Sequence, residues 1–188
     1  MTFPFGRRRY TEVWILRPRL RSDVPDTEIA ASGPPPRQSA AMQPTELQAS
    51  LYERIPLSRA MGVTVLQAEP TGVVLSAPLA PNVNHSGTVF GGSAASVAVL
   101  AAWALVEVRL QSVAQHGRIV IRRSAMDFER PIVADFTAIA GSPAAADWER
   151  LLSTLRRGRM GRIVVRSVLE CEGTRVGELE GEFAVVPT

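Results

Sequence analysis

The chain has 188 residues, 46% of them hydrophobic, so it is long enough to bury one full core. Its 21 basic residues are all arginine and exceed the acidic residues by three. Residues 1–42 hold seven arginines and four acidic residues, which accounts for the whole excess, and residues 43–188 carry fourteen of each. The body of the chain therefore lacks the basic bias of a nucleic-acid-binding domain.

Residues 1–42 are predicted to form a flexible extension, because the Pro-, Ser- and Ala-rich run at 30–41 has little to pack. A basic arm that touches lipid or nucleic acid is the alternative. The arginines at 7–9 are followed by no hydrophobic signal core, which argues against twin-arginine export. The single cysteine, Cys171, rules out an internal disulfide, and we expect a cytoplasmic protein.

Residues 43–188 are predicted to form one domain that begins with a short helix between Thr45 and Pro56. Two strands are expected next, at 62–69 and 72–80, from alternating apolar residues around a Pro-Thr-Gly turn.

A long apolar helix is predicted over residues 91–113, ending at His116-Gly117. Within it, Val89–Val106 has no charged residue over 18 positions, the lower limit for a membrane span. Its paired glycines, its serines and its many alanines favour a buried helix, and no span is expected.

The second half of the body predicts strands at 118–128 and 133–141, then a helix with Ser142 as N-cap and Pro143 at its first position. This helix has one apolar face and closes at 156–158. Two final strands are expected to form a hairpin through Glu172–Thr174, with arginines on one outer face opposite glutamates on the other. The order of elements predicts an α+β fold in which a largely antiparallel sheet wraps one central helix.

The stretch Asn84-His-Ser-Gly-Thr-Val-Phe-Gly-Gly-Ser93 leads directly into the long helix. Paired glycines at a helix start leave backbone N–H groups open at its positive end, which suits a carbonyl or other anionic oxygen. The same glycines also permit a tight helix entry against a strand, so both interpretations stay open.

With this loop and the following Val-Leu-Ala-Ala-Trp103, the chain resembles the hot-dog fold of acyl thioesterases, and more narrowly the thioesterase family typified by the YiiD C-terminal domain. The resemblance covers about residues 45–187. It implies a homodimer, or a dimer of dimers, whose sheets join edge to edge, with acyl-thioester sites at the subunit interface.

The resemblance also suggests roles for individual residues. Gly91 and Gly92 are expected to polarise the thioester carbonyl, with Phe90 and Ser93 beside the substrate, because preorganised amides stabilise an oxyanion. Asn84 is a candidate for holding or activating the attacking water, and it matches the asparagine of the Asn-x-x-Gly-x-x-His-Gly-Gly motif of related hot-dog thioesterases. A loop-capping Asx turn is its alternative interpretation.

A general base is harder to assign. Phe90 stands where many relatives have histidine, and Val99 where they place an acid. His85 is one candidate for activating water, because histidine is the residue type whose unperturbed pKa lies nearest neutral pH, and a solvent-facing loop residue is the alternative. Asp127, at a strand end, is the other candidate, with a surface acid as its alternative.

No metal site is predicted, because two histidines and one cysteine offer few ligands. No cofactor is expected apart from coenzyme A or phosphopantetheine as part of the substrate. Exposed arginines are candidates for meeting a nucleotide phosphate or an acidic carrier protein: Arg122, Arg123, Arg130, Arg156, Arg157 and Arg159.

Three functions follow. The first is an acyl-CoA or acyl-carrier-protein thioesterase of fatty-acid metabolism. The second is a non-hydrolytic module that binds an acyl thioester, which Phe90 and Val99 favour. The third is an interaction protein whose basic tail anchors it to an anionic surface.

Overall fold

A computed structural model describes residues 42–188 of the chain. The predicted extension at 1–42 therefore lies, apart from its last residue, outside the described residues.

The body of the chain alternates helices and strands in the order expected. The elements are α1 (Pro44–Arg54), α2 (Pro56–Ala60), β1 (Thr64–Glu69), β2 (Gly72–Ala77), a 3-10 helix η1 (Ala80–Asn82), α3 (Gly91–Ser112), β3 (Arg118–Phe128), β4 (Phe136–Gly141), α4 (Ala145–Arg156), β5 (Gly161–Cys171) and β6 (Thr174–Val186).

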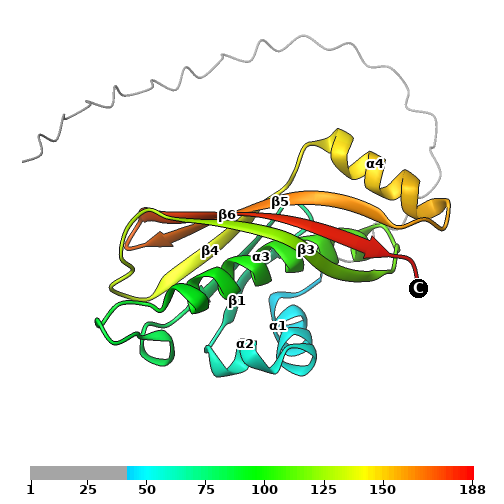
Figure 1. Ribbon diagram of the computed structural model, residues 1–188. Coiled ribbons are helices and arrows are strands. Elements are labelled where there is room, and N and C mark those ends of the chain that lie inside the picture. Colours follow the sequence, from blue (N-terminus) through cyan, green and yellow to red (C-terminus); the bar gives the residue numbers. More distant parts are fainter. Residues whose placement is uncertain (1–41) are drawn as a thin grey trace, which may run out of the picture. The chain divides into compact units, whose positions relative to one another are not determined.

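The six strands form one antiparallel sheet in the order β1-β2-β4-β5-β6-β3. The sheet curves over one side of α3, while α1 and α2 lie on the other side (Figure 1). α3 contacts every strand of the sheet. This is the α+β arrangement predicted from the sequence, a sheet wrapped around one long helix.

The packing of α3 depends on small side chains. Half of its 22 residues are buried, and five of those eleven are alanines. Alanine has no atoms beyond Cβ, so the strands approach the helix closely. The helix is long and apolar enough to cross a membrane, with a mean hydropathy of 1.6, but 61% of its apolar window is buried inside the domain.

The end of α3 differs from the prediction. The helix stops at Ser112, four residues before His116, and Ala114 takes the left-handed conformation at φ 51°. The amide of Gln115 donates to the Leu110 carbonyl at 3.0 Å, and the amide of Ala114 donates to Gln111 at 3.0 Å. These two bonds are a Schellman motif, with alanine in the place that glycine usually takes.

Two helix starts also differ. α4 begins at Ala145, not at Pro143, because the Ser142 hydroxyl accepts a hydrogen bond from the indole of Trp148 at 2.9 Å instead of capping the helix. Pro56 does not only end α1. It is the first residue of a second short helix, α2, that hydrophobic spacing did not reveal, since Pro suits the first helical turn.

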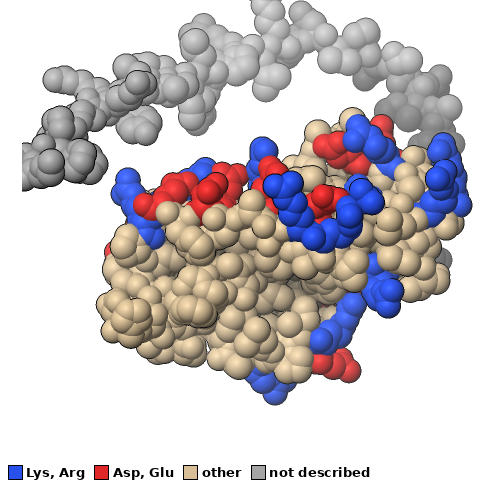
Figure 2. All heavy atoms as spheres, in the orientation of Figure 1, with Lys and Arg blue, Asp and Glu red and all other residues tan. Residues whose placement is uncertain are grey.

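The outer face of the sheet carries a network of ion pairs, and this confirms the predicted complementarity of the last hairpin. Arg166 lies across the ladder from Glu180, with N and O 2.9 Å apart. Hydrogen bonds that the guanidinium donates to Glu129 and Glu178 raise the pKa of Arg175. Figure 2 shows these charges along the upper rim of the molecule, whereas few charges lie below it.

The two edges of the sheet are unlike each other. β1 is short and packs against α1, whose Gln48 side chain accepts a hydrogen bond from the Val65 amide at 3.0 Å. β3 has 11 residues, most of them exposed, and no strand pairs with its outer side among the described residues. Such an edge is an open template for another strand.

The close approach of α3 to the sheet gives a first test. We expect Ala101→Leu to lower the free energy of unfolding by about 1–3 kcal/mol, because a completely buried site has no room for the added carbons. Ala146→Leu, at an exposed position of α4, is the control and should change stability by less than about 0.5 kcal/mol. Urea unfolding measures both, and equal effects would contradict the packing.

Candidate active site

The start of α3 leaves three backbone donors unused. Phe90 is the N-cap residue, and its carbonyl accepts the first helical hydrogen bond from Ala94 at 3.0 Å. Within residues 42–188, nothing accepts a hydrogen bond from the amides of Gly91, Gly92 and Ser93. No side chain caps the helix either. The positive end of a 22-residue helix is therefore open to an anionic oxygen.

Two exposed aromatic rings flank the glycine pair. The ring of Phe90, 58% exposed, lies so close to Gly92 that an added Cβ would collide with it. On the other side, the ring of Phe128, 57% exposed, lies 3.4 Å from where a Cβ of Gly91 would be. A side chain at position 92 would displace the Phe90 ring, so the tight-entry interpretation of the pair holds together with the open amides.

Asn84 uses its side chain to shape the loop before the helix. Its Oδ1 accepts hydrogen bonds from the amides of Ser86 at 2.8 Å and Thr88 at 3.3 Å. Its Nδ2 donates to the Thr88 hydroxyl at 3.0 Å and to the Val89 carbonyl at 3.4 Å. The bond to Ser86 is the Asx turn that was the alternative interpretation, and both polar atoms of the side chain are occupied.

The candidate bases lie apart. His85 is exposed in the loop that Asn84 shapes. Asp127 lies opposite Glu178 in the β3–β6 ladder, on the outer face, whereas its neighbour Phe128 reaches Gly91. His85 therefore lies in the loop just before α3, whereas Asp127 lies on the face of the sheet turned away from that helix.

Sequence reasoning missed one residue that holds this region together. Asn82 is almost completely buried, and its Nδ2 donates to the carbonyls of Met61 at 2.9 Å and Pro78 at 2.8 Å. Its own carbonyl accepts a hydrogen bond from the Phe90 amide at 2.7 Å. Asn82 thus joins the end of α2 to the start of α3, and only its place in a Pro-Asn turn hinted at a local role.

An apolar groove of about 420 Å³ runs beside α3, between that helix, α2 and the strands β3 and β6. None of its lining side chains is titratable. They are Ile55, Leu57, Met61, Ala95, Ser96, Val99, Leu100, Trp103, Ile119, Ile121 and Phe183. Val99, where relatives place an acid, lies in this lining.

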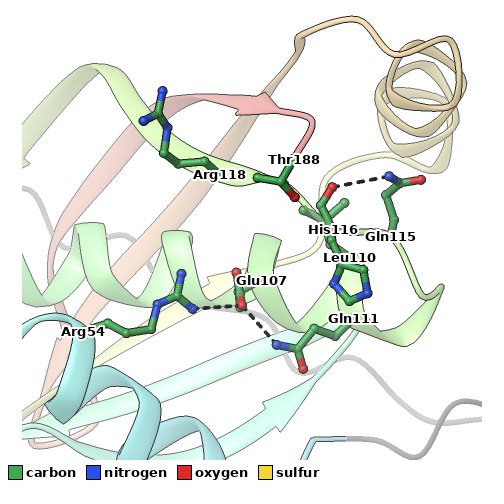
Figure 3. Close-up of a pocket in the computed structure, with 9 residues that line it drawn as sticks. Arg54, Glu107, Leu110, Gln111, Gln115, His116, Arg118 and Thr188 are labelled. Carbon is green, nitrogen blue, oxygen red and sulfur yellow. Dashed lines mark hydrogen bonds and ion pairs between the residues drawn. The ribbon is translucent and has the colours of Figure 1, made fainter.

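A second hollow, of about 260 Å³, lies at the other end of α3 and is polar. Figure 3 shows Arg54 and Gln111 both turned toward Glu107, while Arg118 points away from them. The Arg54 guanidinium lies 3.1 Å from the Glu107 carboxylate, and Gln111 donates to the same oxygen at 3.0 Å. This hollow is too far along the helix to share the open amides.

Other predicted ligands fall outside the site. Of the six candidate arginines, Arg122 is paired with Glu182 at 2.6 Å on the outer face of the sheet. Cys171 is a free, buried cysteine. Across residues 42–188, no three His, Cys, Asp or Glu side chains gather where they would hold a metal ion.

Solved structures resemble this arrangement over nearly their whole length. A crystal structure of a putative thioesterase from Shewanella oneidensis matches with a TM-score of 0.70 and 27% identity, over 77% of this chain and 97% of that one. A Chlorobaculum tepidum protein of unknown function matches with a TM-score of 0.72 and 23% identity, over 79% and 99%. A Pseudomonas aeruginosa protein described as a probable thioesterase matches at 0.63 and 23%, over 78% and 97%.

These likenesses confirm the hot-dog fold that the resemblance implied. The family model described as "Putative thioesterase (yiiD_Cterm)" matches residues 44–187, which is the whole described body apart from its ends. The glycine pair with open amides, at the start of a central helix that a sheet wraps, thus lies in the region that the family model matches. The chain belongs to this thioesterase family.

Proposed function

We propose that the protein hydrolyses acyl thioesters of coenzyme A or an acyl carrier protein at the start of α3. The observation that carries this proposal is that α3 begins with the open amides of Gly91, Gly92 and Ser93, and that residues of the same helix from Ala95 onward line an apolar groove. Amides suit a carbonyl that gains negative charge, and an apolar groove suits the hydrocarbon chain attached to it.

Hydrolysis adds one water to the thioester carbonyl and releases a carboxylic acid and a thiol. As water attacks, the carbonyl oxygen becomes an oxyanion, and each well-placed amide stabilises that state by about 3 kcal/mol. The proton leaves the water and returns to the departing sulfur. His85, exposed in the loop that precedes the helix, is the proposed carrier of that proton.

Asn84 acts through the loop in this proposal. Its four hydrogen bonds fix residues 84–89 and so fix where His85 and Phe90 stand relative to the helix. It is a positioning residue in this structure and not a ligand of the water. Asp127 lies on the outer face of the sheet, which is turned away from α3, so we give it no role.

A non-hydrolytic binding module is the second candidate. The observation that favours it is the apolar lining of the groove, in which Val99 and Phe183 leave no carboxylate to activate water. A module of this kind would bind the same acyl thioester, so the two candidates differ only in turnover.

We also infer a homodimer formed by two β3 edges. Exposed apolar side chains lie along β3, which is otherwise open on its outer side within the described body: Val120 at 39%, Ile121 at 42% and Phe128 at 57%. Isologous pairing of one edge with itself gives a closed two-fold dimer, the commonest assembly of soluble proteins.

The faces of β3 determine one register for this pairing. A bulge between Ile121 and Arg123 leaves Ile119, Ile121, Ser124, Met126 and Phe128 on the inner face. We place a two-fold axis at Ser124 and count the bulge as one position of the ladder. Ile119 then lies opposite Phe128 of the second copy, and Ile121 lies opposite Met126 of the second copy. Every inner residue then meets an inner residue, which cross-strand neighbours require.

The same register pairs the outer face favourably. Arg118 comes opposite Glu129 of the second copy, so unlike charges meet. Phe128 is both a pairing residue and the neighbour of Gly91, so the second copy would border the thioester site. The proposed compartment is the cytoplasm, and the proposed cofactor requirement is none beyond the carrier of the substrate.

The first test is turnover of a panel of acyl-CoAs. We expect wild type to release free thiol and Gly92→Val to lower kcat by about 100-fold, because the added side chain and the displaced Phe90 ring cover the amides. Gly141→Val is the control, since its Cβ would have open space. Tight binding without turnover in wild type would reject hydrolysis and support the binding module.

The second test separates Asn84 from His85. We expect Asn84→Ala to lower the free energy of unfolding by about 1–3 kcal/mol, because the loop loses four hydrogen bonds. His85→Ala should change it by less than about 0.5 kcal/mol while lowering kcat. Urea unfolding and thiol release measure the two effects, and equal loss of stability would contradict the division of roles.

The third test concerns assembly. We expect wild type to sediment as a dimer and Val120→Asp to sediment as a monomer, because the new charge would face Asp127 of the second copy. Val164→Asp is the control, since Val164 is exposed on β5 inside the sheet and not at its edge. A monomeric wild type, or a dimer that survives in Val120→Asp, would contradict the β3 interface.

A further inference from the structure

We propose that Trp103 is the end wall of the groove and limits the acyl chain to about thirteen carbons. The inference rests on the proposed thioester site, because it takes the open amides as the point where the acyl chain begins. It adds to that site the residue that selects the substrate by length.

The helix period places the groove directly below the amides. Gly92, Ser96, Val99 and Trp103 follow one another at i, i+4, i+7 and i+11, which is one stripe of a helix with 3.6 residues per turn. The last three of these residues line the groove. A chain whose carbonyl lies at the Gly92 amide therefore runs along this stripe toward Trp103.

Contacts on two sides hold the Trp103 ring in place. Its Nε1 donates a hydrogen bond to the Ile119 carbonyl at 3.4 Å, which ties it to β3. The Arg54 guanidinium lies over the ring, 5.1 Å from its centre. Since both the polar edge and one face of the ring are occupied, the indole forms a fixed wall.

Beyond Trp103 the surface changes from apolar to charged. One turn further along the same stripe lies Glu107, which binds Arg54 at 3.1 Å and accepts a hydrogen bond from Gln111 at 3.0 Å (Figure 3). A longer hydrocarbon chain would remove water from this ion pair and would offer it no hydrogen bonds in exchange. That cost adds a second barrier behind the ring.

The length of the groove gives the limit. Trp103 lies eleven residues after Gly92, where the carbonyl is placed, and this corresponds to about 16 Å of helix. An extended carbon chain, with bonds of about 1.5 Å and angles near 111°, advances roughly 1.25 Å per carbon. About thirteen carbons therefore fit before the chain meets the indole.

The experiment measures binding without hydrolysis. Calorimetry with S-(2-oxoalkyl)-coenzyme A ketones, which keep a carbonyl but have no thioester bond, should show affinity that rises about fourfold per methylene up to chains of about thirteen carbons and then levels off. In Trp103→Ala the plateau should begin at least four carbons later. In Val99→Phe, which blocks the stripe one turn earlier, it should begin near about eight carbons.

Arg54 is a positioning residue in this scheme, and the chain offers a matched control for it. Arg54→Met keeps an unbranched stem but removes the charge above Trp103, and we expect the plateau to move beyond about thirteen carbons. Arg59→Met removes a similar contact, in which Arg59 lies 5.0 Å from the centre of the Tyr52 ring, away from the groove lining. It should keep the limit of wild type.

The outcomes separate this inference from the proposed activity. An unchanged plateau in both Trp103→Ala and Val99→Phe would overturn the role of Trp103, even if acyl-CoA is hydrolysed. A plateau that shifts as expected in a protein without turnover would uphold Trp103 and reject hydrolysis. If Trp103→Ala fails to fold, Val99→Phe and Arg54→Met decide the result.

Discussion

Burial of α3 against the curved sheet is the constraint on which the rest of the structure depends. The helix is apolar on nearly all sides, so it is stable only where protein surrounds it. The sheet covers one side, and α1 with α2 covers part of the other. What these elements leave uncovered becomes the groove, which is why a functional cavity and the core share the same helix.

The same burial fixes the direction of the helix and therefore its electrostatics. Asn82 ties the residues before α3 to the end of α2, so the helix start is held at the mouth of the groove. Polar amides and apolar side chains are then contiguous although they have opposite affinities for water. An acyl thioester has this polarity too, with a polar carbonyl at one end and a hydrocarbon chain behind it.

The sequence was most informative where a pattern has a single physical cause. All six strands were expected, and alternation marked β2, β5 and β6, because strand faces have a strict period of two. The opposed charges of β5 and β6 correctly indicated their pairing. Helix ends were less predictable, since Ala114 and Ser142 act through tertiary contacts that local preference does not contain. The glycine pair located the helix start, but the Phe128 ring beside it comes from a strand 37 residues away. Such contacts, like that of Arg54 with Trp103, become visible only in three dimensions.

The difference between the two sheet edges determines how far association can proceed. α1 shields β1, and the Gln48 side chain already satisfies the Val65 amide there. Within residues 42–188, β3 is the sheet edge left open to a strand from another molecule. In the proposed dimer each chain would occupy this edge with its first contact, so the pairing would close on itself and not extend into a filament.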